Sequence, residues 1–280
     1  MSPTTIAPLS VLITGCSSGF GELAALTFAD RGHQVFATMR TPGKSAALNG
    51  RPDITQLALD VCDAASVDAA VAEAIRRAGR IDVVVNNAGI EVFGAVHLVS
   101  DDEVLRQMDT NVLGVIRMVR AVVPHLVANG GGAIVTVGSI AGLVGTPYGG
   151  IYAASKHAVE ALTEAMHFEL SHLGVRVSVV EPGQFATALG DNGVHAAGMI
   201  EGSPEAVRRD RFRTAQRTLV NGQPAHPQAV ADAIYCAATE RPGKLRYLVG
   251  ADAELIAATK AAMSFEDFDV TMRAALDFHD

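Results

Sequence analysis

A glycine-rich turn between an apolar run and an amphipathic segment, in residues 10–32, constrains the fold more than any other stretch of the chain. The run SVLI contains β-branched residues, glycines follow at positions 15, 19 and 21, and apolar residues then recur at helical spacing. Such glycines let the backbone turn sharply and approach a ligand closely, and a helix N-terminus offers N–H groups to phosphate oxygens. We therefore predict a strand, a phosphate-binding turn and a helix, the alternative being a turn without a ligand.

The same alternation of short apolar runs and helical patterns continues to residue 250. Runs such as VVV and AIVTV are apolar on both faces, as in strands that helices cover on both sides. The sequence predicts an α/β fold, a doubly wound parallel sheet (Rossmann fold) of about seven strands with helices on both faces. Further strands are expected at 34–39, 54–60, 82–87, 132–139, 175–183 and 246–250, and helices at 64–78, 101–128, 150–172 and 227–239.

We predict one domain over residues 1–280, since α/β folds commonly reach this length as a single unit. Between residues 188 and 223 the alternation gives way to Gly, Asn, His and charged residues. We interpret this segment as an irregular substrate-binding loop or lid. Residues 251–280 are expected to form a C-terminal extension with a helix.

Composition and charge exclude several classes of function. The net charge of -8 and the absence of a basic run argue against nucleic acid and membrane partners. No apolar stretch approaches ~20 residues and the first ten residues do not resemble a secretory signal, so we expect a soluble, cytoplasmic protein. The three cysteines, Cys16, Cys62 and Cys236, form no C-x-x-C pair, which suits a reducing compartment. His167 and His172 are five apart and no HExxH motif is present, so no metal site is predicted.

The segment GGIYAASKHAVEAL, 149–162, places Tyr152 and Lys156 four residues apart on a predicted helix. Any pair at this spacing shares a helix face, so spacing alone does not distinguish chemistry from chance. A phenol titrates near pH 10, and a nearby cation favours its ionised form, so Lys156 is expected to lower the pKa of Tyr152. Ser139 ends a predicted strand, where doubly wound folds bind ligands. Tyr148 has no lysine four residues on, and we interpret it as pocket wall or surface.

Taken together, the motifs resemble those of the single-domain short-chain dehydrogenase/reductase family over roughly residues 9–250. The motifs, in chain order, are TGCSSGFG (14–21), Asp60, NNAG (86–89), Asn111, Ser139, Tyr152 with Lys156, and PGQFAT (182–187). The stretches VFATMR and VEPGQFAT further resemble the branch with 17β-hydroxysteroid and retinol dehydrogenases. That branch hints at a bulky apolar ketone or aldehyde of steroid, retinoid or xenobiotic type.

This resemblance implies an oxidoreductase, of carbonyl reductase type, that transfers a hydride between a nicotinamide and a carbonyl or alcohol. Tyr152 would be the general acid in reduction and the general base in oxidation, and Lys156 would also hold the nicotinamide ribose. Ser139 would hydrogen-bond the reacting oxygen and Asn111 would anchor a relay water. The alternatives are an epimerase or dehydratase on the same fold, and a nucleotide-sensing protein without catalysis.

Cofactor choice, by the same resemblance, depends on the end of the second strand. Met39 stands where NAD-preferring relatives carry an acid, and Arg40 follows it, so NADP is expected, with NADPH preferred over NADH. Asp60 would meet the adenine, or else cap the following helix. Cys16 is either a small turn residue or a reactive thiol. The expected cofactor-binding residues are Gly15, Ser17, Ser18, Gly19, Phe20, Gly21, Arg40, Asp60, Val61, Asn87, Ala88, Gly89, Tyr152, Lys156, Pro182, Gly183, Phe185 and Thr187.

The expected partners are a small carbonyl or alcohol substrate and further copies of the chain. The family pairs through the two helices predicted here at 101–128 and 150–172, so a homotetramer is the first expectation and a homodimer the second. For Leu143 and Val144, core packing is an equally good interpretation. The candidate substrate-binding residues are Ser139, Leu143, Val144, Tyr148, Tyr152 and Phe185.

Overall fold

Seven parallel strands form the central sheet of the computed structural model, which describes residues 7–185, 193–219 and 226–276. The strand order is β3-β2-β1-β4-β6-β7-β9, and each neighbouring pair is parallel. This confirms the predicted doubly wound sheet, whose order reverses between β1 and β4, the place where such folds bind ligands. The strands span Ser10–Ile13 (β1), Gln34–Met39 (β2), Ile54–Ala58 (β3), Val83–Asn86 (β4), Gly132–Val137 (β6), Val175–Pro182 (β7) and Arg246–Val249 (β9).

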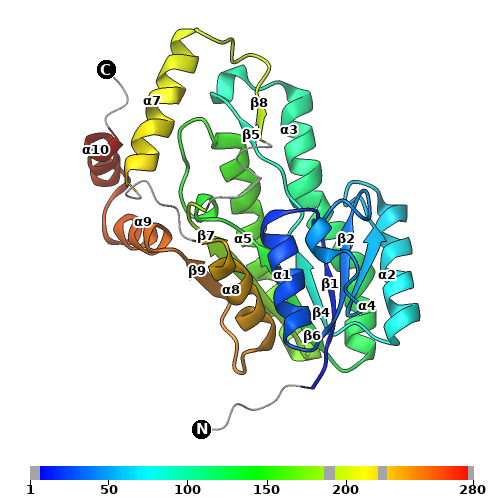
Figure 1. Ribbon diagram of the computed structural model, residues 1–280. Helices are drawn as coiled ribbons and strands as arrows, with labels where there is room; N and C mark the ends of the chain where they lie inside the picture. The colour runs from blue at the N-terminus through cyan, green and yellow to red at the C-terminus, as the bar shows by residue number, and fades with distance from the viewer. Residues whose placement is uncertain (1–6, 186–192, 220–225, 277–280) are drawn as a thin grey trace.

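Helices cover both faces of this sheet (Figure 1). One face carries α1 (Gly19–Asp30) and α8 (Gln228–Thr239), and the other carries α2 (Ala64–Ala78), α4 (Gly114–Ala128) and α5 (Gly150–Leu170). Strand residues alternate between the two cores: Val11 and Ile13 pack toward α1 and α8, and Leu12 packs toward the opposite helices. Successive strand residues face opposite cores, and both cores are apolar. A strand buried on both faces is therefore a continuous apolar run, which is the pattern that predicted these strands.

The predicted helix 101–128 contains a π turn. It consists of α3 (Asp101–Met108), the π segment η3 (Asp109–Leu113) and α4. By length and composition alone it is long and apolar enough to cross a membrane, since an 18-residue window within it has a mean hydropathy of 1.4. The same helix contacts α2 and α5, as a helix that packs beside a sheet does. Single 3-10 turns occur at Ala46–Leu48 (η1), Val96–Leu98 (η2), Ile140–Gly142 (η4) and Ser171–Leu173 (η5).

The prediction of irregular chain through 188–223 is wrong for residues 204–219, which form helix α7 (Pro204–Leu219). Ser203 accepts a hydrogen bond from the Ala206 N–H at 3.2 Å, and proline in the first turn suits a helix start. Ala206 and Phe212 are buried on α7. Five arginines in this helix mask that sparse apolar pattern. The role of this segment as a lid remains a prediction.

A small layer completes the molecule around α7. Strand β8 (Val194–His195) pairs in parallel with β5 (Val92–Phe93), outside the main sheet. The C-terminal extension forms two helices, α9 (Ala251–Ala262) and α10 (Phe265–Leu276), where one was expected. Helix α10 contacts both α7 and α9, so it links the extension to the part of the chain above the sheet (Figure 1).

Candidate functional site

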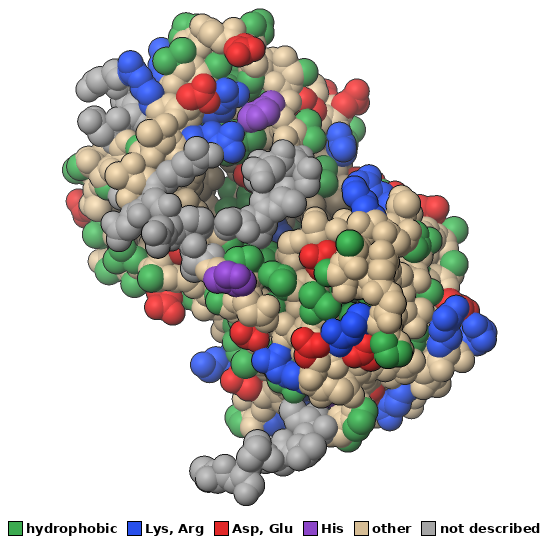
Figure 2. Space-filling view, viewed as in Figure 1, with side chains coloured by type: hydrophobic (Ala, Val, Ile, Leu, Met, Phe, Trp, Pro, Cys, Tyr) green, Lys and Arg blue, Asp and Glu red, His purple; other side chains and the backbone are tan. Residues whose placement is uncertain are grey.

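A cavity of about 940 Å³ lies at the carboxyl edge of the sheet, below α7 and β8. The face shown in Figure 2 is hollowed near its centre, with Lys or Arg and His side chains gathered above the hollow. The cavity brings together most of the predicted site residues, although they come from many separate elements. These are Gly15, Ser17, Ser18, Gly19, Phe20, Arg40, Asp60, Val61, Asn87, Ala88, Gly89, Ser139, Tyr152, Lys156, Pro182, Gly183 and Phe185.

The first turn has the close packing that its glycines predicted. A Cβ on Gly15, whose φ is +73°, would lie 2.8 Å from the Ala88 Cα. A Cβ on Gly21 would lie 2.4 Å from the Asn87 side-chain nitrogen and 2.5 Å from the Gly15 carbonyl oxygen. Asn87 donates hydrogen bonds to the carbonyls of Thr14 and Gly15, at 2.8 and 3.1 Å. The amide of Asn87 therefore holds the turn against the end of β4, and no larger residue fits at Gly21.

The start of α1 is open to a ligand. Ser18 occupies the N-cap position with extended backbone, but its side chain makes no cap hydrogen bond. Ser17, Ser18 and Gly19 all line the cavity. A helix N-terminus without a side-chain cap, beside a cradle that a Cβ would fill, fits the pyrophosphate of a dinucleotide.

Cys16 lies within this turn and is fully buried. Its Sγ donates a hydrogen bond to the Ile13 carbonyl at 3.3 Å. Burial raises the pKa of the Cys16 thiol well above its ordinary value. The structure thus favours the small turn residue over the reactive thiol.

Two cationic side chains line the cavity near the end of β2. Arg40 is exposed at the end of β2, Lys44 follows it in the cavity wall, and Met39 is buried. Asp60 does not cap α2, because Asp63 occupies that N-cap and accepts from the Ala65 N–H at 2.9 Å. The interpretation of Asp60 as a helix cap is therefore wrong. Asp60 accepts a hydrogen bond from the Cys62 N–H at 3.0 Å and lines the cavity.

Tyr152, Lys156 and Ser139 meet where α5 passes the end of β6. Lys156 is buried, donates to the Val137 carbonyl at 2.8 Å, and has its Nζ 5.6 Å from the centre of the Tyr152 ring. Ser139 accepts from the Ala141 N–H at 3.1 Å, which fixes its hydroxyl at the strand end. A proton donor, a cation and a second hydroxyl therefore share one wall of the cavity.

The expected lowering of the Tyr152 pKa is wrong for this structure. Burial, and then the charge of Glu91, raises the pKa of Tyr152, and hydrogen bonding to Ser139 offsets only part of the rise. Burial also lowers the pKa of Lys156 to about 8, against the opposing charges of Glu160 and Glu91. The Tyr152 hydroxyl therefore carries its proton at neutral pH, as a general acid requires.

Asn111 lies behind this wall, in the π turn, and is 2% exposed. Its side chain accepts from the Ile90 N–H at 2.9 Å and donates to the Ile90 carbonyl at 3.0 Å. It also donates to the Ser155 hydroxyl at 3.1 Å, and Ser155 donates to the Tyr152 carbonyl at 2.7 Å. The π turn, a frequent feature of functional sites, thus connects the end of β4 to the backbone of Tyr152.

Several predicted substrate residues do not line the cavity. Leu143 and Val144 pack beside Ala253 and Phe268 of the C-terminal helices, which favours the core-packing interpretation. Tyr148 has a φ of 61° and packs on Phe212 of α7, with ring centroids 6.0 Å apart.

Two other predicted site residues do not line the cavity either. Gly21 and Asn111 support the cavity from behind, and Thr187 lies outside the described residues.

Sequence reasoning missed several polar residues that line the cavity, among them Lys44, Glu91, His195 and Arg213. Glu91 stands two residues beyond the NNAG motif, so an acid next to a recognised motif was an available signal. Arg213 on α7 lies over the Phe93 ring, 5.0 Å from its centre. His195 and Arg213 gave no signal, because they lie in β8 and α7, the strand and helix that were not predicted.

A pair of buried carboxyl groups lies behind Lys156. Glu160 follows Lys156 by one turn of α5, and Glu181 lies near the end of β7 and is 0% exposed. Arg246 approaches Glu160 at 3.1 Å and Glu181 at 3.8 Å. Burial raises the pKa of both carboxyl groups. The charge of the neighbouring Glu160 raises the pKa of Glu181 further.

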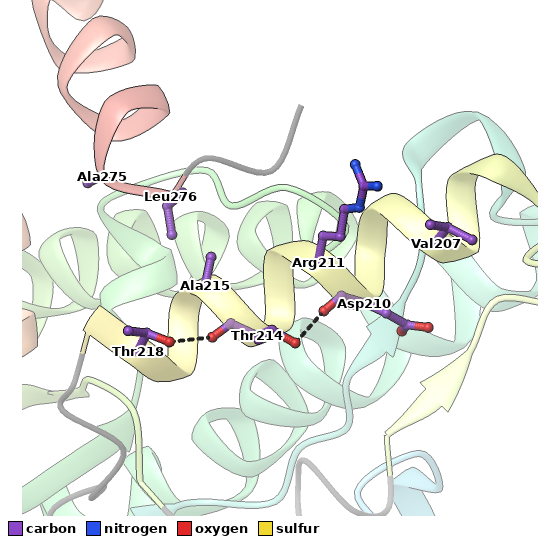
Figure 3. A pocket seen from close by; sticks show the side chains of 8 residues that line it. All are labelled: Val207, Asp210, Arg211, Thr214, Ala215, Thr218, Ala275 and Leu276. Atoms are coloured by element: carbon purple, nitrogen blue, oxygen red, sulfur yellow. Dashed lines mark hydrogen bonds between the residues drawn. The ribbon is translucent and has the colours of Figure 1, made fainter. Parts of the chain in front are cut away.

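A second hollow, of about 690 Å³, lies between α7 and the end of α10 (Figure 3). Ala215 and Leu276 point toward one another across it. The hydroxyls of Thr214 and Thr218 donate to carbonyls one turn earlier, at 2.9 and 3.1 Å. None of the predicted site residues lines this hollow, so the chemistry belongs to the larger cavity.

Comparison with known proteins relates this geometry to characterised relatives. The chain is 40% identical to a 3-ketodihydrosphingosine reductase of Bacteroides thetaiotaomicron over 185 residues, 66% of this chain and 67% of that protein. It is 36% identical to human retinol dehydrogenase 8 over 243 residues, 81% of this chain and 77% of that protein. It is 38% identical to human 17-beta-hydroxysteroid dehydrogenase type 1 over 208 residues, 70% of this chain and 61% of that protein.

Solved structures show the same fold, and two of those compared contain a bound cofactor. A short-chain dehydrogenase from Streptomyces avermitilis matches with a TM-score of 0.80 and 29% identity, over 97% of this chain and 98% of that one. A relative from Burkholderia phymatum in complex with NAD has a TM-score of 0.79 and 25% identity, over 96% and 97% of the two chains. One from Burkholderia cenocepacia in complex with NADP has a TM-score of 0.74 and 26% identity, again over 96% and 97%.

These neighbours support a nicotinamide cofactor without deciding between NAD and NADP. The family model described as short chain dehydrogenase matches residues 10–197, the part of the chain that carries the glycine-rich turn, Ser139, Tyr152 and Lys156. The chain belongs to the short-chain dehydrogenase/reductase family and is an oxidoreductase of that family.

Proposed function

We propose that the protein is an NADP(H)-dependent oxidoreductase that interconverts a bulky, apolar ketone or aldehyde and the corresponding alcohol. The observation that carries the proposal is the meeting of Ser139, Tyr152 and Lys156 in the cavity that begins at the glycine-rich turn. When bound, the nicotinamide accepts or supplies the hydride. Tyr152 donates a proton to the carbonyl oxygen during reduction, because its hydroxyl keeps the proton at neutral pH.

The other residues position this transfer. The Ser139 hydroxyl lies beside Tyr152 and hydrogen-bonds the reacting oxygen. Lys156 is fixed by its bond to the Val137 carbonyl, within reach of Tyr152 and of a ribose in the same cavity. Named relatives act on a sphingoid ketone, retinol and a steroid, which supports an apolar substrate for this chain.

The test of this function is the absorbance of NADPH and NADH during incubation with steroids, retinoids, aliphatic aldehydes and aromatic ketones. The expected result is stoichiometric oxidation of the cofactor by at least one class of carbonyl. An epimerase or dehydratase would convert substrate without net cofactor oxidation. A nucleotide-sensing protein would bind the cofactor with no turnover of any compound.

NADPH is expected to give a higher kcat/KM than NADH. Arg40 and Lys44 line the cavity after β2, where they could bind a 2′-phosphate, and Met39 offers no acid to repel it. Arg40→Ala is expected to lower kcat/KM for NADPH by about 10- to 100-fold, the value of a charge-assisted hydrogen bond, with little change for NADH. Arg76→Ala removes an exposed arginine on α2 and serves as the control. A wild-type preference for NADH would contradict the assignment.

Self-association through the α3–α4 and α5 helices is part of the same proposal, with a homotetramer first and a homodimer second. Supporting it, Leu105 and Leu113 are 65% and 45% exposed on the first helix, and Phe168 is 78% exposed on α5. Light scattering is expected to give four chains per particle, and a monomer would contradict it. A cytoplasmic location is also proposed, supported by the three free cysteines.

A further inference from the structure

Glu91 is an acidic residue in the substrate part of the cavity, and the family resemblance assigned it no role. Buried side chains fix the backbone on both sides of it. Asn111 binds the Ile90 N–H and carbonyl, and Gln107, which is 0% exposed, accepts from the Val92 N–H at 2.7 Å. The Glu91 carbonyl accepts from the Val194 N–H at 2.9 Å. These bonds fix the backbone of Glu91, and with it the point at which the side chain leaves the cavity wall.

The carboxylate of Glu91 lacks a close partner in the described part of the chain. No hydrogen bond, and no ion pair within the usual contact distance, joins it to another side chain there. Arg213 on α7 and Lys156 on α5 act on it only at longer range. The loss of hydration outweighs both cations, so the pKa of Glu91 is raised. A hydrogen-bond donor on a ligand would replace the hydrogen bonds to water that partial burial has removed from the carboxylate.

The position of Glu91 relative to the reacting atoms limits where that donor lies on a substrate. Asn111 bonds both the Ile90 N–H and the Ser155 hydroxyl, and Ser155 donates to the Tyr152 carbonyl. Glu91 therefore lies one residue from a hydrogen-bonded link to Tyr152, and both side chains line one cavity. A carbonyl oxygen held by Tyr152 and Ser139 therefore brings the neighbouring carbons toward Glu91. The wall near Glu91 includes the apolar groups of Phe93 and Val194, with His195 and Arg213 next to Phe93.

We propose that Glu91 determines substrate specificity by binding a donor group, a hydroxyl or an ammonium, on a carbon next to the reacting carbonyl of an otherwise apolar ketone. The inference rests on the proposed reductase function and names the substrate class of that site. An ammonium gains more than a hydroxyl, because it pairs with the charge as well as the lone pairs of the carboxylate. The donor-bearing ketone is reduced to the matching alcohol by one hydride and one proton, with the donor group unchanged.

The experiment compares ketones of one carbon skeleton: unsubstituted, with a 2-hydroxyl, with a 2-amino group, and with a carboxylate. Wild-type kcat/KM is expected to be highest for the amino ketone and lowest for the unsubstituted one, at about pH 6.5, where the amine is protonated. Glu91→Gln is expected to lower kcat/KM for the amino ketone by about 10- to 100-fold, for the hydroxy ketone by less, and for the unsubstituted ketone very little. Glu201→Gln, a change at an exposed acid, is the control.

Two results would overturn the proposal. Equal losses for all ketones in Glu91→Gln would mean that Glu91 acts through Tyr152 and not on the substrate. Preference for the carboxylate-bearing ketone, lost in Arg213→Gln, would mean that Arg213 selects the substrate. Calorimetric binding of the same ketones to the cofactor-loaded Tyr152→Phe variant separates this inference from the proposed function. A donor preference in binding without any turnover in wild type would contradict only the function.

Discussion

Tyr152→Phe is expected to lower kcat by about 10²- to 10⁴-fold, the usual contribution of a positioned general acid. The variant removes a hydroxyl that combines a retained proton with contact to Ser139 and proximity to Lys156. Cofactor affinity should change little, because the variant leaves unchanged the glycine-rich turn and the end of β2, where the cofactor is proposed to bind. Stopped-flow absorbance gives the hydride-transfer rate, and fluorescence titration gives the Kd for the cofactor.

Tyr148→Phe is the matched control for this experiment. Tyr148 lies four residues earlier, but it is not among the residues that line the cavity and packs on Phe212, which does line it. Phenylalanine keeps that ring contact, so activity and stability should stay close to wild type. Loss of turnover in Tyr148→Phe with activity retained in Tyr152→Phe would reverse the assignment of the general acid.

The central sheet was predictable because local pattern and tertiary environment agree there. Strands such as Val83–Asn86 are apolar on both faces and are buried on both faces, so their continuous apolar runs were enough to locate them. The site motifs follow directly from those strands, since their carboxyl ends meet at one edge. That edge is where Gly15, Asn87 and Ser139 lie.

The parts that could not be predicted depend on contacts between segments distant in the sequence. Helix α7 contacts α10, and its Phe212 packs against Tyr148, so its few apolar residues are covered by partners that no local pattern reveals. The pKa of Tyr152 was predicted in the wrong direction for the same reason. Spacing placed Lys156 near Tyr152, but burial and the distant Glu91 determine the shift.

The face of α5 that carries Tyr152 and Lys156 continues one turn further with Glu160, so the buried acid pair adjoins the catalytic wall. Glu160 raises the pKa of Lys156 and thereby helps to keep its charge. Glu181 has no hydrogen-bond partner for either side-chain oxygen within the described residues. Two adjoining carboxyl groups beside a single Arg246 are most stable when one of them keeps a proton.

The free energy of unfolding is therefore expected to fall as pH rises from about 4.5 to about 8, through Glu181. Burial and the charge of Glu160 raise the pKa of Glu181 from 4.5 to about 8 in the folded protein. Between these values the folded chain holds a proton that the unfolded chain has lost, so stability decreases, by at most ~1.4 kcal/mol per pH unit for one proton. Below the unfolded value both states are protonated, and the loss is absent.

Glu181→Gln isolates this effect, because glutamine resembles the protonated acid in shape and does not titrate. The variant should match wild type near pH 4.5 and exceed its stability by about 2 kcal/mol or more at pH 8, as measured by urea unfolding across the range. Glu164→Gln removes the exposed carboxylate that binds the same Arg246 at 2.5 Å, and its difference from wild type should not vary in this way. If the difference in stability between Glu181→Gln and wild type were constant across that range, Glu160 and Glu181 would not share a proton. The negative charge that raises the pKa of Lys156 would then come from a group outside this pair.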